Sequence, residues 1–225
     1  MCFGHRFPLA GIVLATLALA ARTHPQHQAV VENDFSLVSS IRDTLRDNDI
    51  IDDVLDDFEP QYYLDITYPK HHETVMLGND IPVKAVSKRP AFTFHSLLSR
   101  TGEDKNSTLT LVLTDPDATS RDDPKLAEMC HWIVTNLTAP ISEIPPRSER
   151  SGELEEYLPP RPPEKTGRHR YVFVLLEGDT TDIKPPKERV HWGYGKIRHG
   201  VRDWAQENGL DVVGANFFFA QNKKQ

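Results

Sequence analysis

The chain has 225 residues, of which 38% are hydrophobic and 26% are charged, as is usual for a soluble globular domain. The formal net charge of −7 and the lack of a Lys/Arg stripe with interleaved aromatic residues argue against a nucleic-acid-binding protein. The same charge disfavours adhesion to anionic membranes by electrostatic attraction alone. We therefore expect one domain with at most a short appendage.

Residues 1–20 have the features of a secretory signal peptide. Arg6 precedes the charge-free run Leu9–Ala21, which is too short to span a membrane but fits the apolar core of a signal. Ala18-Leu19-Ala20 supplies a small-residue cleavage pattern. We predict cleavage after Ala20 or Ala21, a secreted or secretory-pathway location and no transmembrane segment in the mature chain. An uncleaved signal anchor is the alternative.

Two sequons and one cysteine bear on the same question. Asn106 and Asn136 each begin an Asn-X-Ser/Thr sequence and are candidate glycosylation sites. We expect Asn106, in a polar loop, to be modified more readily than Asn136 at a strand end. Once Cys2 leaves with the signal, Cys130 has no partner for an internal disulfide, and we predict that it is a small buried hydrophobic residue.

Residues 21–60 form a predicted helical and acidic N-terminal segment. Leu37, Ile41 and Leu45 recur at i, i+4 and i+8, which predicts an amphipathic helix beginning with Ser36 as its N-cap. The acids of Asp43–Glu59 are either a partner-binding face or, more simply, a solvated helix face.

Residues 61–225 form the predicted main domain and are dominated by short strand-like runs. Alternating or continuous apolar runs bounded by turn residues are typical of strands. The sequence predicts strands at Tyr62–Tyr68, Ile81–Val86, Ala91–His95, Leu109–Thr114, His131–Thr135, Tyr171–Gly178 and Val212–Ala220, a turn at Gly78–Asp80, a long surface loop over Pro140–Pro163 and a short helix over Val201–Asn208. This pattern predicts a mostly β fold, an antiparallel β-sandwich with peripheral helices.

The loop between the two central strands carries a dense set of polar groups. Asp115, Pro116 and Asp117 follow the buried run LTLVLT directly, and proline restricts the backbone between the two carboxylates. On composition alone the loop is an ordinary turn. A rigid loop at strand ends is also a common place for a binding site.

Three separated motifs favour the binding site. LVLTDPDATSRDDPK, CHWIVTN and PPEKTGRHRYVF together resemble the phosphatidylethanolamine-binding protein family, and the closing RHGVRDWAQENGLDVVGANFFFAQN resembles its fungal branch, which includes carboxypeptidase Y inhibitors. The resemblance covers roughly Asp49–Gln225 and implies the same β-sandwich. Thr119 departs from the family, which usually has proline there.

The resemblance implies a pocket for an anionic group. Its ligand-binding residues would be Asp115, Asp117, His131, Pro162, Pro163, His169 and Tyr171. The expected ligand is a phospholipid headgroup or a small acidic metabolite, without a cofactor or metal ion. Leu126 and Met129 replace aromatic residues of some relatives and predict a less aromatic pocket mouth. Replacing His169 with alanine is expected to weaken binding with little effect on folding.

Two other functions remain open at this stage. Similarity to the fungal branch suggests inhibition of a serine carboxypeptidase of the carboxypeptidase Y type, with the N-terminal segment taking part in the interface. Alternatively, His131, His169 and Asp117 are candidate catalytic residues that transfer protons. That enzyme would belong to a fungal secondary-metabolite pathway, such as one coupling anhydride-bearing polyketide monomers.

Overall fold

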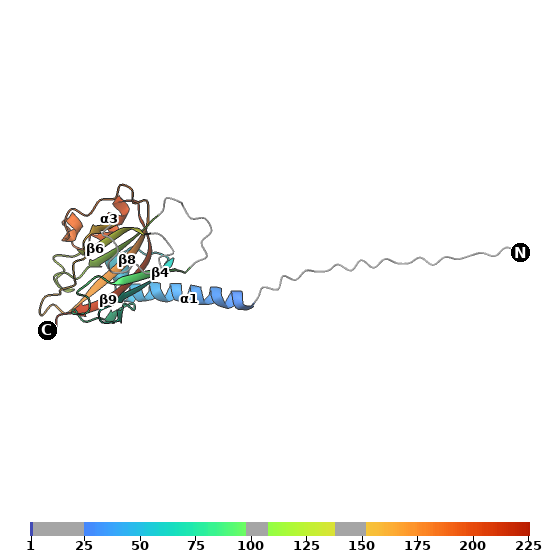
Figure 1. The fold of residues 1–225 in the computed structure, drawn as a ribbon, viewed down its shortest axis with the longest axis horizontal. Helices are drawn as coiled ribbons and strands as arrows, with labels where there is room; N and C mark the ends of the chain where they lie inside the picture. The colour runs from blue at the N-terminus through green and yellow to red at the C-terminus, as the bar shows by residue number, and fades with distance from the viewer. Residues whose placement is uncertain (2–24, 98–107, 138–151) are drawn as a thin grey trace.

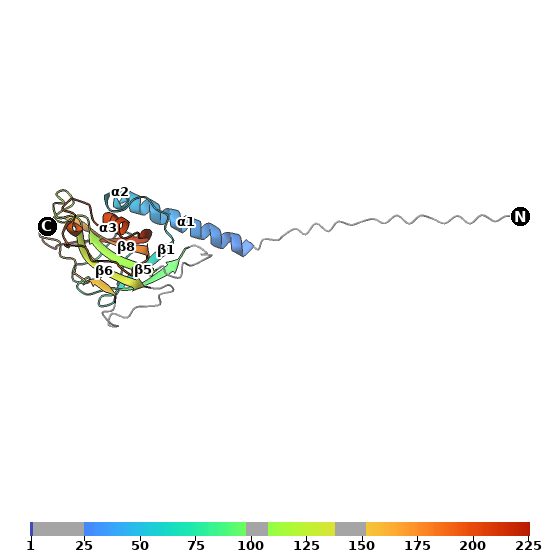
Figure 2. The same ribbon diagram turned by 90° about the horizontal axis from the view of Figure 1, so that it is seen from above.

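The computed structural model describes Met1 and residues 25–97, 108–137 and 152–225, which form two packed β-sheets with helices on one side (Figures 1 and 2). The smaller sheet has the order β2-β1-β4 and the larger has the order β3-β9-β8-β5-β6-β7. The strands are β1 Tyr62–Tyr68, β2 Glu73–Thr74, β3 Asn79–Asp80, β4 Ala91–Ser96, β5 Thr108–Asp115, β6 Met129–Leu137, β7 Glu153–Glu155, β8 Arg168–Gly178 and β9 Asp211–Gln221.

The strand pairings are antiparallel, apart from the short parallel pair of β3 with β9, within the described residues. Strand β1 buries every second residue, so that Leu64 and Ile66 enter the core between the sheets. Leu111 and Leu113 of β5 enter this core from the opposite sheet. The predicted antiparallel β-sandwich with peripheral helices is therefore confirmed.

The second face of the larger sheet is covered by helices. These are α1 Pro25–Asp47, α2 Ile50–Asp53, α3 Val201–Glu207 and the short 3-10 turn η1 His191–Gly193, and Figure 2 shows α1, α2 and α3 gathered on one side of the strands. Val112 of β5 and Val172 of β8 pack in the core on this side. The run LTLVLT is thus buried on both faces, as its short length and its β-branched and leucine residues predict.

Helix α1 differs from the prediction at its start and on its buried face. It begins at Pro25, so Ser36 lies inside the helix and is not its N-cap. Val38, Ile41 and Leu45 are buried, whereas Leu37 is 40% exposed. Leu37 and Val38 are both spaced so that they could share a helix face with Ile41 and Leu45. In the folded protein, Val38 lies on the face that packs in the core. The beginning of α1 extends past the sheets in both views (Figures 1 and 2).

The segment Ile81–Val86 is a turn and not the predicted strand. Pro82 has no N–H for a sheet ladder, and its carbonyl accepts a hydrogen bond from the Ala85 N–H at 2.8 Å. Ile81 and Val86 are nevertheless buried, which explains the apolar pattern. The predicted turn Gly78–Asp80 instead supplies the short edge strand β3, next to β9.

The remaining predictions concern helix α3, the loop before β8 and the segments outside the described residues. Helix α3 ends before Gly209, which has the positive φ of 63° that favours glycine. The described end of the predicted loop Pro140–Pro163 contains strand β7. The predicted signal peptide apart from Met1, the predicted loop before β5 and Asn106 lie outside the described residues. Within the part of the chain that the structure covers, no helix is both long and apolar enough to cross a membrane.

Candidate functional site

The candidate site lies where the end of β5 is next to the beginning of β8. Asp115 is the last residue of β5, and its Oδ1 accepts a hydrogen bond from the Asp117 N–H at 2.8 Å. A hydrogen bond from the backbone N–H to the side chain of an aspartate two residues earlier closes a turn that aspartate commonly forms. It fixes the Asp115 carboxylate, which is only 3% exposed, at the inner end of a cavity.

The cavity has a volume of about 210 Å³ and a mostly apolar wall. It is smaller than the roughly 300–1,000 Å³ of pockets that hold drug-sized ligands. Six of the seven predicted ligand-binding residues line it, namely Asp115, His131, Pro162, Pro163, His169 and Tyr171. Leu126 and Met129 also line it, at positions where aromatic residues occur in some relatives. The cavity therefore has room only for a small ligand or for one end of a larger one.

Both ring nitrogens of His169 have partners within the protein. Nδ1 lies 3.0 Å from Asp115 Oδ2, and Nε2 lies 2.9 Å from Thr166 Oγ1. The Asp115 carboxylate can only accept, so Nδ1 is the donor in the first pair. The Thr166 hydroxyl has a single hydrogen and lies 2.9 Å from both His169 Nε2 and the Pro163 carbonyl oxygen. In this arrangement, His169 holds Asp115 and Thr166 in place and has no free nitrogen for a ligand.

These contacts lead to a different prediction for His169→Ala. His169 is 1% exposed, and its removal would take away the ring that bonds the buried Asp115 carboxylate. A buried charge that loses its partner destabilises the folded state. The substitution would therefore disturb folding as well as the pocket.

His131 presents a different nitrogen to the cavity. Its Nδ1 lies 2.7 Å from the Leu158 carbonyl and donates to it, whereas Nε2 forms no hydrogen bond to the described residues. Burial lowers the pKa of His131, an effect that the charge of Asp115 partly opposes. The ring is therefore neutral near pH 7, and Nε2 offers a lone pair that accepts a hydrogen bond.

Tyr171 completes the inner end of the cavity. Burial raises the pKa of its phenol well above the usual value, and the charge of Asp115 and a hydrogen bond to that carboxylate add to the effect. The phenol therefore stays protonated at neutral pH. Its ring packs edge-on to His131, with centroids 5.3 Å apart. The inner end is rich in acceptors, and the Nδ1 donors of His131 and His169 already have partners.

The comparisons with known proteins identify the family of the chain. Residues 71–218 match the profile of the family described as "Phosphatidylethanolamine-binding protein". The chain belongs to this family. The carboxypeptidase Y inhibitor of Saccharomyces cerevisiae is 33% identical over 208 residues, which cover 80% of this chain and 94% of the relative.

Two solved structures extend the comparison. A carboxypeptidase Y inhibitor in complex with its cognate proteinase has a TM-score of 0.71 and 31% identity, over 83% of this chain and 97% of that one. A phosphatidylethanolamine-binding protein from Plasmodium vivax has a TM-score of 0.68 at 20% identity, over 80% of this chain and 97% of that one. The second likeness supports the fold alone.

In this member of the phosphatidylethanolamine-binding protein family, Asp117 does not line the cavity, contrary to the prediction. Its carboxylate is fully buried and accepts from Arg170, with Nε at 2.9 Å from Oδ2 and Nη2 at 2.6 Å from Oδ1. The turn at Pro116 sends Asp115 and Asp117 in different directions. His131, His169 and Asp117 are therefore not brought together as a catalytic set.

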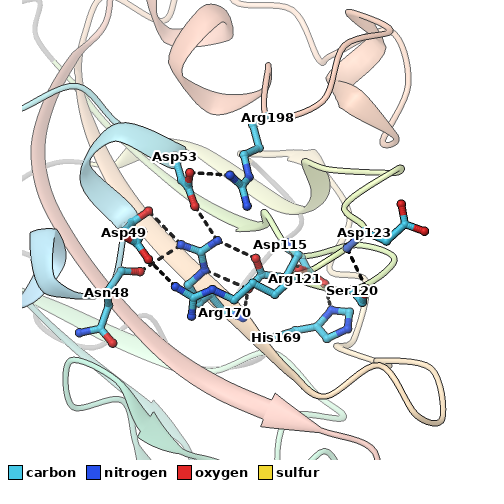
Figure 3. Close-up of polar contacts among 11 residues, drawn as sticks. Asn48, Asp49, Asp53, Asp115, Ser120, Arg121, Asp123, His169, Arg170 and Arg198 are labelled. Carbon is cyan, nitrogen blue, oxygen red and sulfur yellow. Dashed lines mark hydrogen bonds and ion pairs between the residues drawn. The ribbon is translucent and has the colours of Figure 1, made fainter.

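Arg170 connects the Asp117 loop to the N-terminal segment (Figure 3). Its Nη1 donates to the carbonyls of Asn48 and Asp49 at 3.0 and 2.9 Å, and Nη2 lies 2.9 Å from Asp53 Oδ2. Sequence reasoning overlooked Arg170. Strand alternation already implied that it faces away from His169 and Tyr171, toward the side that the helices cover.

Asn136 is the candidate glycosylation site that the structure describes. It lies near the end of β6, is exposed and has a φ of 60°. Its Oδ1 accepts a hydrogen bond from the Thr180 hydroxyl at 2.9 Å. A glycan on this amide would have to accommodate that contact, so the preference for Asn106 stays a prediction.

Proposed function

We propose that this protein binds a small anionic headgroup or a small acidic molecule in the cavity between β5, β6 and β8. The observation that carries the proposal is the cavity of about 210 Å³ with one polar end. Asp115 and the free Nε2 of His131 suit an ammonium or hydroxyl group of the ligand. Phosphoethanolamine combines such a group with a phosphate.

Binding of phosphoethanolamine can be tested by blocking the cavity. Thr119 lines the cavity and is half-buried, so Thr119→Trp should fill the entrance without adding bulk to the core. We expect calorimetric titration to give an affinity at least about tenfold lower, or about 1.4 kcal/mol. Asp122→Trp is the matched control, because Asp122 is exposed in the same loop and does not line the cavity.

The proposal would be overturned if the wild type bound no phosphoethanolamine and released no small molecule in native mass spectrometry. Equal affinities of the wild type and Thr119→Trp, with equal melting temperatures, would place any binding elsewhere on the protein.

A second function, inhibition of a serine carboxypeptidase, is favoured by the relatives. We infer it from the 33% identity to a carboxypeptidase Y inhibitor and from the TM-score of 0.71 to such an inhibitor in its complex. Helix α1 extends past the sheets (Figure 1), and the contacts of Arg170 with residues 48–53 anchor the segment that follows it. The N-terminal segment is thus available for a protein interface.

Inhibition is tested with two forms of the chain. Residues 21–225 should inhibit peptide hydrolysis by carboxypeptidase Y, whereas residues 36–225 should inhibit at least about tenfold less well. The shorter form keeps Val38, Ile41 and Leu45, so its melting temperature should change little. No inhibition by the longer form would exclude the function, and equal inhibition would exclude a role for residues 21–35.

A further inference from the structure

Arg161 stands apart from the other arginines that the structure describes. Arg42, Arg46, Arg89, Arg121, Arg168, Arg170, Arg189, Arg198 and Arg202 each have an acidic partner. Arg161 has neither an ion pair nor a side-chain hydrogen bond to any described residue. It is exposed and also lines the candidate cavity. An unpaired guanidinium beside a small cavity is a natural partner for an anion.

The segment that carries Arg161 is stiff. Arg161 lies between two Pro-Pro pairs in Leu158–Pro163, and proline restricts both its own φ and the residue before it. The carbonyl of Pro162 accepts a hydrogen bond from Asn222 Nδ2 at 3.3 Å. The backbone at Arg161 is therefore already ordered, and binding loses little backbone entropy there.

The other polar groups of the cavity are poorly suited to bind an anion. Both nitrogens of His169 are occupied, and the Tyr171 phenol lies within the influence of the Asp115 charge. His131 Nδ1 donates to a carbonyl, which leaves only an acceptor nitrogen toward the cavity. The Asp115 carboxylate repels negative charge from the inner end. An anionic group is thus best placed at the mouth, where Arg161 lies.

We propose that Arg161 binds the anionic group of the ligand, a carboxylate or a phosphate, at the cavity mouth. The rest of the ligand enters the apolar cavity and directs a hydrogen-bond donor toward His131 Nε2 and Asp115. This assignment rests on the proposed binding function and makes Arg161 the residue that selects acids. A guanidinium can hold either group through two parallel hydrogen bonds.

The assignment is tested with Arg161→Gln and a matched control. Lys165→Gln removes one positive charge from the same surface, because Lys165 is exposed and does not line the cavity. Titrations use phosphoethanolamine, inorganic phosphate and succinate. We expect Arg161→Gln to weaken binding of the preferred probe about ten- to a hundredfold, and Lys165→Gln to change it less than about twofold.

The outcomes separate this inference from the proposed function. If the wild type binds and Arg161→Gln binds equally well, the role of Arg161 is overturned and the cavity function stands. If the wild type binds none of the probes, both fall. Tighter binding of phosphoethanolamine than of succinate identifies a headgroup ligand, and the reverse order identifies a carboxylic acid.

The pH dependence gives an independent readout. A guanidinium remains charged throughout the accessible range, and succinate is fully ionised above about pH 7. The titratable groups that face the cavity are Asp115 of β5, His131 of β6, and His169 and Tyr171 of β8. We expect succinate to bind with similar affinity at pH 7 and pH 9. A tenfold loss at pH 9 would mean that a histidine, not Arg161, holds the anion.

Discussion

Replacing Arg170 with methionine is expected to lower the free energy of unfolding by about 3–5 kcal/mol, because the buried Asp117 carboxylate loses its partner. Both side chains of this pair are fully buried. The variant also removes the donors to the carbonyls of Asn48 and Asp49. Urea denaturation of the wild type and the variant measures the difference.

Arg168→Met is the matched control for this prediction. Arg168 precedes His169 on the same strand, but its ion pair with Asp80 is exposed, at 45% and 68% of the two side chains. Its removal should change the stability by about 1 kcal/mol or less. Similar losses for the two variants would contradict a special role of the buried pair. Adding Asp117→Asn to Arg170→Met should recover part of the stability, since it removes the unpaired charge.

Replacing Glu128 with glutamine is expected to make the protein more stable than the wild type at alkaline pH. Glu128 is fully buried, and its Oε1 has no hydrogen-bond partner within the described chain. Its Oε2 accepts from Thr114 Oγ1 at 3.0 Å. Burial raises the pKa of this carboxyl from 4.5 to about 8. At neutral pH the folded protein therefore keeps a proton that the unfolded chain has released.

The direction of the effect follows from this difference in bound protons. Between pH 4.5 and about 8, the folded state binds more protons than the unfolded state at this group, so stability falls as the pH rises. The slope approaches about 1.4 kcal/mol per pH unit, which gives a total of roughly 4–5 kcal/mol. The contribution of protonated Glu128 is complete below pH 4.5 and is lost above about pH 8.

Denaturation curves at pH 5, 7 and 9 test the prediction. Glu128→Gln should match the wild type within about 1 kcal/mol at pH 5 and exceed it by several kcal/mol at pH 9. Glu164→Gln is the control, because Glu164 is exposed and its contribution should vary little with pH. A constant difference between Glu128→Gln and the wild type at all three pH values would show that Glu128 does not titrate in this range.

The environment of Glu128 also explains why residue 200 is a glycine. A Cβ atom at Gly200 would lie 2.7 Å from Glu128 Cδ, too close for any side chain. The carboxyl therefore packs directly against the backbone at the start of α3. This contact links the strand that carries His131 to the helix side of the larger sheet, through a group that sequence reasoning did not single out.

The strands were largely predictable because each has a local signature. Tyr62–Tyr68 alternates between buried and half-buried residues, and LTLVLT, rich in leucine and β-branched residues, is buried throughout because both faces of its sheet are covered. Ile81–Val86 has the same kind of pattern but forms a turn. Apolar residues in a turn that packs on the core cannot be distinguished from a short strand by periodicity alone.

The candidate pocket shows the same division between local pattern and tertiary contact. Motif resemblance alone identified six residues that line one cavity, among them Asp115, His131 and His169. It placed Asp117 with them, although the buried Arg170 holds that carboxylate on the other face. It also did not indicate that both nitrogens of His169 are occupied.

Motifs and periodicity were enough to predict the family, the antiparallel sandwich and the strands that carry the pocket, because both are properties of residues that are near one another in the chain. Only the folded structure shows which face of α1 is buried, where Asp117 points and which of the described arginines lacks an acidic partner. These properties depend on contacts between segments far apart in the chain, such as Arg170 with Asn48 and Asp49. Whether a hydrogen-bonding group is free can be judged only when every partner that folding brings near it is known.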